Sequence, residues 1–461
     1  MALHTNPKVT LHSSDRGLEK GFERMKHQAL HWVFEGHPVG DYYEAALPGR
    51  EAFCMRDVSH QCTGAEILGL SSHNKNMFSK FAASISDTRD WCGFWEINRL
   101  DRPCSADYRD DTDFWYNLPA NFDVLHACWR MYLWTGDKDY LVRPEFDHFY
   151  AQTMEAYIKR WDRDGDGLPD RNPGNGRRGI AGYDEDDPSK EKILVATDML
   201  AAMARAHLSC AKICAALGRL EQAKTYRDKG DELLALLNND FYTEEQGFAD
   251  GLGRQRELLY RHGRHSTEYL TLYWDTVPDS TRREKMLDAL PGTVAQADIE
   301  VFSHYPEIQW RYGRREQALL SLRRLMDPGL PRKEYPEASY SAVGAVATGL
   351  VGIKPDAAHG IIETCSGLSG IDWAELGYVP VMGREISICH EKLSKTSFTL
   401  ESGDSVTWRG VFQGIGQVHI NGSPVETYAV QREFDPDGEI CSYCDVVVNA
   451  GEMAEAIFQK H

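Results

Sequence analysis

The sequence predicts a mainly helical protein, built as a closed ring of helical hairpins and followed by a small β-rich domain. Two observations predict the ring: apolar residues recur at helical spacing over most of the chain, and glycine-centred turns separate successive helices. A third predicts the β-rich domain, because apolar and polar residues alternate after about residue 385. We therefore expect a helical domain over residues 1–380 and a β-sandwich-like domain over residues 381–461.

Helical periodicity is clear in three segments. Each segment places apolar side chains on one helix face: Phe122, Leu125, Trp129 and Tyr132; Met199, Met203, Ala206, Cys210 and Ile213; Ala318, Leu322 and Leu325. Gly136, Gly218 and Gly313 stand in similar turns after helices, where glycine favours the left-handed cap. The spacing of these turns is not strictly periodic, which favours a closed ring of hairpins over a solenoid.

The β-rich end is predicted from alternating segments. These are residues 385–390, 397–400, 406–412, 417–420 and 444–448, with a hairpin turn at Asn421 and Gly422. Long loops interrupt the helical part at residues 36–64, 87–117, 162–195, 243–266 and 327–341. Loops of this length inside a compact domain are usually functional, so we expect the site to be built from them.

Composition excludes several classes of partner. The 461 residues carry a net charge of −19, which would be repelled by nucleic acid and by anionic membrane surfaces. No apolar run reaches membrane-spanning length, and the N-terminus lacks the pattern of a secretory signal. The 11 scattered cysteines fit free thiols in a reducing compartment, so we expect a cytoplasmic location. The oligomeric state is left open.

The segment Gly179–Asp184 is the most informative stretch of the chain. It follows the acidic, glycine-punctuated loop Asp162–Asp170 and precedes a long helix that begins near Thr197. A carboxylate on a glycine-flanked loop, beside aromatic residues and between helices, is typical of the proton donor of a sugar hydrolase. Glu185 and Asp187 add negative charge, which would raise the pKa of Asp184, although they also suit the start of the next helix.

These motifs carry a resemblance to a known group of enzymes. The loop Asp162–Asp170, the run Gly182–Asp184 and the helix from Thr197 resemble the six-hairpin, (α/α)6-barrel glycosidases, notably bacterial relatives of glucosylceramidase-type β-glucosidases. Tyr340–Asp356 is instead similar to the end of the barrel in α-L-rhamnosidases. The resemblance implies an (α/α)6 barrel, Asp184 as general acid, and a catalytic Glu ahead of the last barrel helix. It leaves the sugar open, because each motif is matched only in part.

Glycoside hydrolysis needs a second carboxyl group, and two residues compete for it. Glu337 is held by the preceding Pro336 and flanked by Tyr335 and Tyr340, and Glu334 is its rival. A surface charge at a helix start is the alternative for both. The position of this Glu, similar to that in rhamnosidases, implies inversion at the anomeric carbon.

The other loops supply candidate substrate-binding residues. Arg56 and Asp57 could hydrogen-bond sugar hydroxyls or brace their own loop. The aromatic and polar candidates for stacking on or orienting a sugar are Trp91, Trp95, Asp113, Trp115, Tyr116, Tyr183, His304 and Trp310. Core packing is the alternative for each Trp. Arg177 lies near Asp184 in sequence and could bind the carboxylate of a uronic acid or balance the acidic loop.

One metal site is considered. Asp162, Asp164 and Asp166 match the start of a calcium loop, but the twelfth position is Pro173 rather than Glu, which excludes an EF-hand. A structural Ca²⁺ and an ion-free polar turn both fit this run. No other cofactor is expected.

The sequence thus predicts a glycoside hydrolase that removes a terminal sugar from small oligosaccharides or glycosides. One alternative is a sugar 2-epimerase or a lyase on the same barrel, using His60, His304 or Tyr183 as acid and base. Another is a non-catalytic carbohydrate-binding protein. All three bind a small carbohydrate.

Overall fold

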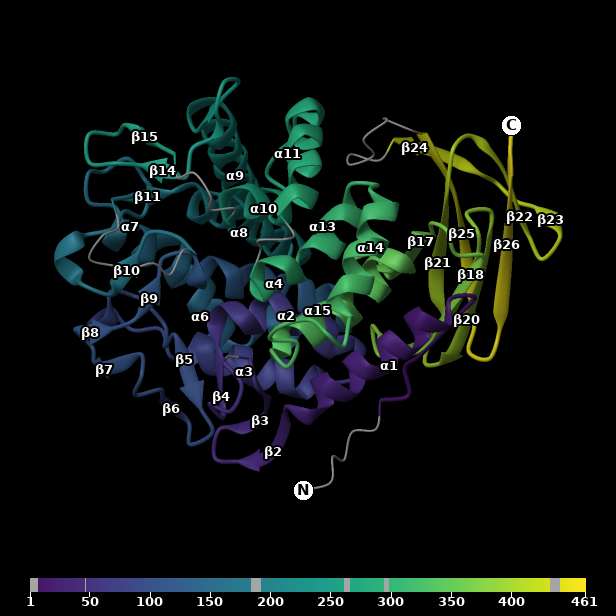
Figure 1. The fold of residues 1–461 in the computed structure, drawn as a ribbon, viewed down its shortest axis with the longest axis horizontal. Helices are drawn as coiled ribbons and strands as arrows, with labels where there is room; N and C mark the ends of the chain where they lie inside the picture. Colours follow the sequence, from purple (N-terminus) through teal and green to yellow (C-terminus); the bar gives the residue numbers. More distant parts are fainter. Residues whose placement is uncertain (1–6, 46, 184–191, 261–265, 294–297, 432–439) are drawn as a thin grey trace.

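The computed structural model describes residues 7–45, 47–183, 192–260, 266–293, 298–431 and 440–461. Helices dominate the chain up to Leu350, and strands dominate it from Lys354 onward (Figure 1). Within the described residues, no helix combines the length and the apolar character needed to cross a membrane.

Six helices form a closed inner ring. They are α2 (Met55–Ile67), α4 (Ala120–Thr135), α8 (Thr197–Ala216), α10 (Ser266–Tyr273), α13 (Tyr305–Arg311) and α15 (Pro336–Ala345). Each contacts the next in this order, and α15 closes the ring on α2. Apolar residues predominate on the buried faces of most of these helices, which is the pattern that the sequence shows at helical spacing, whereas α2 also buries several polar side chains.

An outer layer of helices alternates with the ring along the chain. Its members are α1 (Arg16–His31), α3 (Ser71–Ala83), α6 (Pro144–Gln152), α9 (Leu220–Asp240), α11 (Ser280–Thr293) and α14 (Arg315–Leu325). The pairs α2 and α3, α8 and α9, α10 and α11, and α13 and α14 contact each other as hairpins, and α1 packs on α15. Inner and outer helices together make an (α/α)6 barrel, which confirms the predicted fold class.

Helices α2 and α15 approach each other closely because α2 carries a glycine at the crossing. A Cβ built on Gly64 would lie 2.0 Å from the backbone oxygen of Tyr340. Any side chain at this position would push the two helices apart. The first and last inner helices of the ring therefore meet backbone to backbone.

Short elements fill the connections between these helices. The helices are α5 (Asp139–Val142), α7 (Ile158–Trp161) and α12 (Ile299–Ser303), and π-helical turns cover Thr153–Tyr157 and Val346–Leu350. The strands are β2 (Val33–His37), β3 (Gly40–Tyr43), β4 (Ala52–Cys54), β5 (Glu96–Asn98), β6 (Arg102–Pro103), β7 (Tyr108–Asp110), β8 (Asp113–Phe114), β9 (Tyr116–Asn117), β10 (Arg178–Ile180), β11 (Val195–Ala196), β12 (Tyr242–Thr243), β13 (Gly247–Phe248), β14 (Gly251–Leu252) and β15 (Leu258–Leu259).

The C-terminal part contains two sheets. The seven-stranded sheet has the order β1-β18-β19-β20-β26-β22-β23, and the five-stranded sheet has the order β16-β17-β21-β25-β24. Their strands are β1 (Thr10–Ser13), β16 (Lys354–Asp356), β17 (Ile361–Cys365), β18 (Trp373–Val381), β19 (Arg384–Glu391), β20 (Lys395–Ser402), β21 (Val406–Gln413), β22 (Gly416–Ile420), β23 (Ser423–Pro424), β24 (Tyr428–Gln431), β25 (Ile440–Val448) and β26 (Met453–Lys460).

The boundary expected between residues 380 and 381 falls inside strand β18. The β part begins instead at Lys354, and it recruits β1 from the N-terminal end of the chain. Strand β1 has four residues, too few to show a period in sequence. The two sheets pack face to face, because the rings of Phe398 and Trp408, one from each sheet, stack with centroids 5.3 Å apart.

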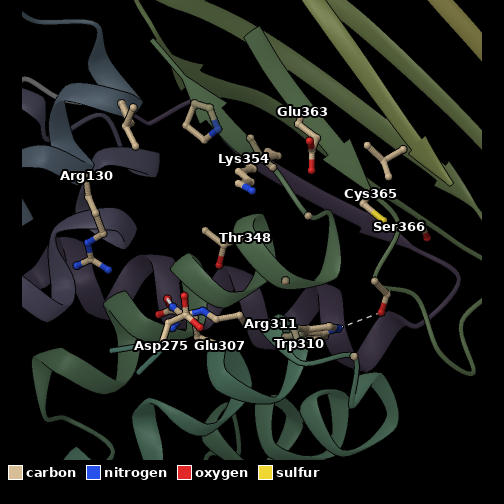
Figure 2. Close-up of a pocket in the computed structure, with 18 of the residues that line it drawn as sticks. Arg130, Asp275, Glu307, Trp310, Arg311, Thr348, Lys354, Glu363, Cys365 and Ser366 are labelled. Carbon is tan, nitrogen blue, oxygen red and sulfur yellow. Dashed lines mark hydrogen bonds and ion pairs between the residues drawn. The ribbon is translucent and has the colours of Figure 1, made fainter. Parts of the chain in front are cut away.

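The β part is seated on the C-terminal ends of the inner helices. Trp310 of α13 donates a hydrogen bond of 3.0 Å from its indole nitrogen to the backbone oxygen of Gly367 (Figure 2). The backbone oxygen of Trp134 in α4 accepts a bond of 2.6 Å from Met382, and that of Val351 accepts one of 2.9 Å from His390. One end of the barrel is thus covered by the β part.

Candidate active site

Polar side chains gather at the opposite end of the barrel, where the inner helices begin. Arg56, Asp57 and His60 belong to α2, Asp123 to α4, Asp198 to α8, Tyr269 to α10, His304 to the start of α13, and Glu337 to the first turn of α15. Most of these residues are buried. Buried polar groups are costly unless they serve each other or a ligand, so this end is the candidate site.

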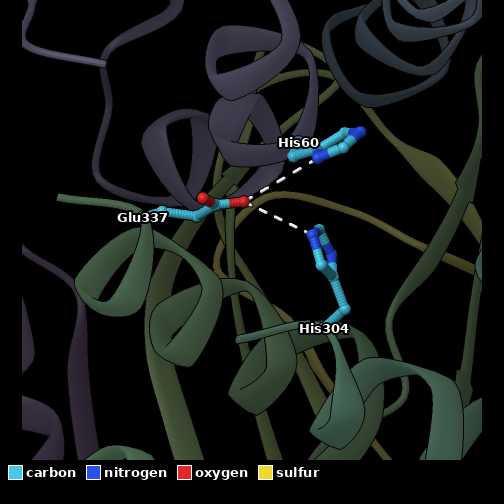
Figure 3. Close-up of side chains that lie close together, drawn as sticks. All are labelled: His60, His304 and Glu337. Atoms are coloured by element: carbon cyan, nitrogen blue, oxygen red, sulfur yellow. Dashed lines mark ion pairs between the residues drawn. The ribbon is translucent and has the colours of Figure 1, made fainter. Parts of the chain in front are cut away.

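Glu337 lies at the centre of this group, facing two histidines. Its Oε1 atom is 3.3 Å from Nε2 of His304 and 3.7 Å from Nδ1 of His60 (Figure 3). The three residues are only 2%, 5% and 8% exposed. Glu337 comes from the start of a helix whose Pro336 fixes the backbone at its first position.

Burial sets the protonation of this cluster. It raises the pKa of Glu337 to about 8, Glu300 adds to the effect by repulsion, and the guanidinium of Arg56 opposes it. Burial lowers the pKa of His304 to about 4 and holds the pKa of His60 well below its usual range. Both imidazoles are therefore neutral near pH 7, and the carboxyl group is the one that titrates closest to neutrality.

Aromatic rings wall this cluster. The His60 ring centroid lies 4.8 Å from that of His304 and 5.1 Å from that of Tyr273. Tyr269 stacks on His304 with centroids 5.5 Å apart, and Tyr183 lies 6.0 Å from His60. Such rings keep the carboxyl group out of bulk water and offer faces on which a sugar ring can stack.

Arg56 connects the cluster to the loop that carries Tyr183. It donates a hydrogen bond of 3.3 Å to the backbone oxygen of Tyr183, and its guanidinium lies 5.7 Å from the ring centroid of Trp95. Nε of Arg56 lies 3.8 Å from Oδ1 of Asp57. The structure thus brings five predicted substrate-binding residues, Arg56, Asp57, Trp95, Tyr183 and His304, to the surroundings of Glu337.

Two buried carboxylates hold Tyr183 in place. Its hydroxyl donates a hydrogen bond to Asp123, and its backbone N–H donates one of 2.9 Å to Asp198. Burial holds the pKa of Asp123 well above its usual range. Both acids follow the first residue of a long apolar helix by only a few positions. An acidic residue in the first turn of an apolar helix, on its buried face, is the sequence signal that could have identified Asp123 and Asp198. Tyr269 and Glu300, near the starts of α10 and α12, were likewise not predicted from the sequence.

The three carboxylates predicted to be catalytic differ in where they lie. Asp184 follows Tyr183 directly in the chain but lies outside the described residues. Glu334 is exposed on the connection before α15, whereas Glu337, three residues on, is buried. Helix α15 begins at Pro336, so its first turn carries Glu337 into the ring and leaves Glu334 outside.

The remaining candidates lie away from Glu337. Trp310 ends α13 and contacts the β part, because the helix carries it to the other end from His304 at its start. The guanidinium of Arg177 pairs with Asp113 at 2.9 Å, so both are engaged with each other. Tyr116 is buried in the apolar core, where its hydroxyl donates to Asn121, and the half-buried Trp91 and Trp115 pack against that core.

Among the residues that the structure describes, two groups of side chains place ligand atoms close enough for a metal ion: His60 with His304 and Glu337, and Asp162 with Asp164 and Asp166. In the second group the guanidinium of Arg256 pairs with Asp164 at 3.4 Å and also with Asp166. The carboxylate of Asp162 accepts backbone hydrogen bonds within its own loop. Calcium binding by this loop stays a prediction.

Comparison with known proteins agrees with this architecture. Residues 114–301 match the family model described as the bacterial alpha-L-rhamnosidase six-hairpin glycosidase domain. No curated protein sequence matches the chain.

Among solved structures, similar folds include rhamnosidases from three organisms. A GH78 family rhamnosidase of Bacillus sp. GL1 has a TM-score of 0.62 at 14% identity, covering 87% of this chain and 41% of its own. An alpha-L-rhamnosidase from Dictyoglumus thermophilum has a TM-score of 0.62 at 12% identity, with coverages of 100% and 51%. One from Aspergillus terreus has a TM-score of 0.60 at 14% identity, with coverages of 97% and 51%.

The chain therefore spans about half, or less, of the length of these three proteins. At such identities the structural likeness speaks for the fold, and the family match speaks for residues 114–301. Residues 114–301 are therefore similar in sequence to the six-hairpin glycosidase domain of bacterial alpha-L-rhamnosidases, and the fold of most of the chain is similar to that of the three rhamnosidases above.

Proposed function

We propose that this protein is a glycoside hydrolase that removes a terminal sugar from small oligosaccharides or glycosides with inversion. The observation that carries the proposal is the environment of Glu337, a buried carboxyl group faced by two imidazole nitrogens at the end of the helical ring where the inner helices begin. The family match over residues 114–301 supports the same class of reaction. Its description makes α-L-rhamnosides the first substrates to test.

In this proposal Glu337 is the general base that takes a proton from water. A carboxylate whose pKa lies near the operating pH is a stronger proton acceptor than an exposed one. Ring nitrogens of His60 and His304 face its Oε1 atom and can donate N–H groups to the ionised form. Arg56 adds positive charge on the same side.

The proton donor in this proposal is Asp184, which the resemblance to six-hairpin glycosidases implies. The residue before it, Tyr183, is fixed by Asp123, Asp198 and Arg56 within the cluster. In an inverting enzyme the two carboxyl groups stand roughly 6.5–9.5 Å apart, which leaves room for a water molecule. The protein is proposed to act in the cytoplasm, since its 11 cysteines are unpaired and nearly all are buried.

A panel of p-nitrophenyl glycosides tests the proposal, beginning with the α-L-rhamnoside and the β-glucoside. We expect one glycoside to be hydrolysed, with the first-formed anomer inverted by ¹H NMR. Glu337→Gln should lower kcat by a factor on the order of 10²–10⁴ without loss of fold. Glu334→Gln is the matched control, because Glu334 is exposed.

Two results contradict this assignment. Equal activity of Glu337→Gln and wild type on the hydrolysed glycoside would remove Glu337 from the reaction. Retention of configuration at the anomeric carbon would make Glu337 a nucleophile instead of a general base. Asp184→Asn tests the proton donor in the same assay. The activity of this variant should be restored in part on glycosides whose leaving group needs no protonation.

The pair His60 and His304 favours a second candidate, a sugar 2-epimerase or lyase. Their rings are in edge-to-face contact with centroids 4.8 Å apart, which places two neutral imidazoles, each able to move a proton, side by side. An epimerase exchanges the proton at C2 of a free sugar with solvent. Incubating aldoses and ketoses in D₂O therefore separates the two functions: deuterium incorporation without bond cleavage supports the epimerase.

A further inference from the structure

A large cavity lies at the end of the barrel away from Glu337. It has a volume of about 760 Å³ and is enclosed by the C-terminal ends of the inner helices on one side and the β part on the other (Figure 2). Trp134 of α4, Arg311 of α13 and Thr348 line it from the barrel, and Glu363 and Arg409 line it from the five-stranded sheet. A volume of this size accommodates a sugar-sized molecule.

The lining of this cavity is positively charged in a strongly acidic protein. It contains six basic residues and three acidic residues, and Asp445 behind the lining pairs with Arg409 at 2.7 Å, which leaves an excess of two positive charges, whereas the chain as a whole carries −19. The basic residues are Arg130, Arg205, Arg311, Arg315, Lys354 and Arg409. Such a concentration of one sign inside low-dielectric walls attracts a ligand of the opposite sign.

The acidic residues of the lining are already paired in part. Glu307 pairs with Arg311 at 2.6 Å, and Asp275 pairs with Arg205 at 2.8 Å. These pairs fix the two guanidinium groups at the wall of the cavity. Figure 2 shows Lys354 reaching into the space between the helices and the sheet.

Two buried donors in the lining have no acceptor within the part of the chain that the structure describes. They are Nε of Arg130 and the indole nitrogen of Trp274, whose side chain is 1% exposed. Arg130 is held by hydrogen bonds to the backbone oxygen of Ser59 at 2.5 Å and to the hydroxyl of Tyr273 at 3.3 Å. Neither nitrogen has accessible surface, so both contribute positive charge and N–H dipoles beside the cavity rather than direct contacts to a ligand.

The pKa of a histidine in the lining agrees with a positive potential in the cavity. The pKa of His126, which also lines the cavity, is held well below its usual range by burial and then by Arg130, Arg205, Lys212 and Arg311. Every charged group among these causes is a cation. The local field therefore disfavours a further positive charge and favours an anion.

We propose that this cavity binds a small organic anion of about monosaccharide size, with a phosphate monoester as its anionic group. Guanidinium groups recognise phosphate and carboxylate oxygens alike, but a dianion offsets more of the excess positive charge than a carboxylate does. The site is separate from Glu337, and the inference does not depend on the proposed hydrolase function. Tyr273 belongs to both regions, since it lines the cavity and its ring lies 4.8 Å from that of His304.

Isothermal titration calorimetry with glucose 6-phosphate, inorganic phosphate, glucuronate and glucose tests the proposal. We expect glucose 6-phosphate to bind most tightly and uncharged glucose not to bind at the cavity. Lys354→Gln should weaken glucose 6-phosphate binding roughly tenfold, and Lys354→Glu more strongly, because each removes a charged donor from the lining. Lys20→Gln is the matched control, since Lys20 is an exposed lysine of α1 outside the cavity lining.

The outcomes are distinct. Tightest binding of glucuronate would overturn phosphate as the anionic group, and equal binding of inorganic phosphate would overturn the sugar-sized part of the ligand. Unchanged affinity in both Lys354 variants, or glucose binding as well as glucose 6-phosphate does, would overturn the anion site itself. Loss of binding in Glu337→Gln but not in the Lys354 variants would move the anion to the other end of the barrel, and would also overturn the proposal.

Discussion

At the scale of single residues, three positions in the chain separate a buried carboxyl group from an exposed one. Glu334 and Glu337 were both candidates from the sequence, because each stands beside the proline and tyrosines ahead of a helix. The choice depends on where α15 begins, and helix ends are set by tertiary contacts as well as by local sequence. The two histidines that face Glu337 come from α2 and from the start of α13, so only the closed ring brings them together.

The pKa of Glu337 makes the proposed role testable by pH. As a general base Glu337 must be ionised, so kcat/KM should rise with pH up to about 8 and level off above it. A general acid would have to be protonated, and kcat/KM would then fall above pH 8. The measurement is kcat/KM across pH 5 to 10 on the hydrolysed glycoside, with Glu334→Gln as control. A decrease in kcat/KM above about pH 8, seen also in Glu334→Gln, would instead make Glu337 the general acid and Asp184 the general base.

At the scale of elements, the long helices and the β strands were predictable, and the pairing between distant segments was not. The periodic residues from Phe122 to Tyr132 lie in α4, and those from Met199 to Ile213 lie in α8. Strands of two or three residues, such as β9 (Tyr116–Asn117) and β10 (Arg178–Ile180), pair across the chain, and they are too short to leave a period. Those pairings bring the loop of Tyr183 to the ring, which explains why the site could be predicted only in pieces.

The contact between α2 and α15 gives a prediction at this scale. Gly64→Ala would place a Cβ 2.0 Å from the backbone oxygen of Tyr340, so the helices must separate. We expect a loss of about 1–3 kcal/mol or more in the free energy of unfolding, measured with urea. Gly344→Ala on the facing helix is the control, since its Cβ would meet Gly64 at an ordinary 3.5 Å and should stabilise by up to about 1 kcal/mol. Equal effects of the two changes would refute the close approach.

The acidic loop gives a second prediction at this scale. The guanidinium of Arg256 occupies the carboxylates of Asp164 and Asp166, so Ca²⁺ has to compete with it. We expect millimolar Ca²⁺ to raise the Tm of Arg256→Ala more than that of the wild type, because the variant leaves the carboxylates unneutralised. The same experiment with Mg²⁺ separates a calcium site from general charge screening. Identical shifts in variant and wild type would count against calcium binding by this loop.

At the scale of the whole molecule, the barrel has two different ends. Loops and polar residues occupy the end where the inner helices begin, and the β part covers the end where they stop. The sequence predicted both parts, but the strand β1 from the N-terminal end ties them together in a way that no local pattern shows. Buried carboxyl groups occur within the ring, and they couple the stability of the whole fold to pH.

Two of these carboxyl groups titrate near neutral pH and contribute to the change of stability above it. Burial raises the pKa of Glu66 to about 7 and that of Glu337 to about 8, whereas both titrate near their usual value once the chain unfolds. Between these values the folded protein holds protons that the unfolded chain has released, so raising the pH lowers the free energy of unfolding. The stabilising contribution is full below the unfolded pKa and is lost as the pH passes the folded pKa.

The window for this measurement is pH 7.5 to 8.5, above the range in which unfolded histidines titrate. Buried histidines such as His304, whose pKa is lowered to about 4, are neutral in the folded state there and mostly neutral in the unfolded one. Urea unfolding should show a free energy that falls across this window in the wild type. Glu337→Gln carries no charge at either pH, so its free energy should fall less and exceed that of the wild type at pH 8. Parallel slopes in the two proteins would mean that Glu337 is ionised in the folded state without cost, which would place water or a cation beside it.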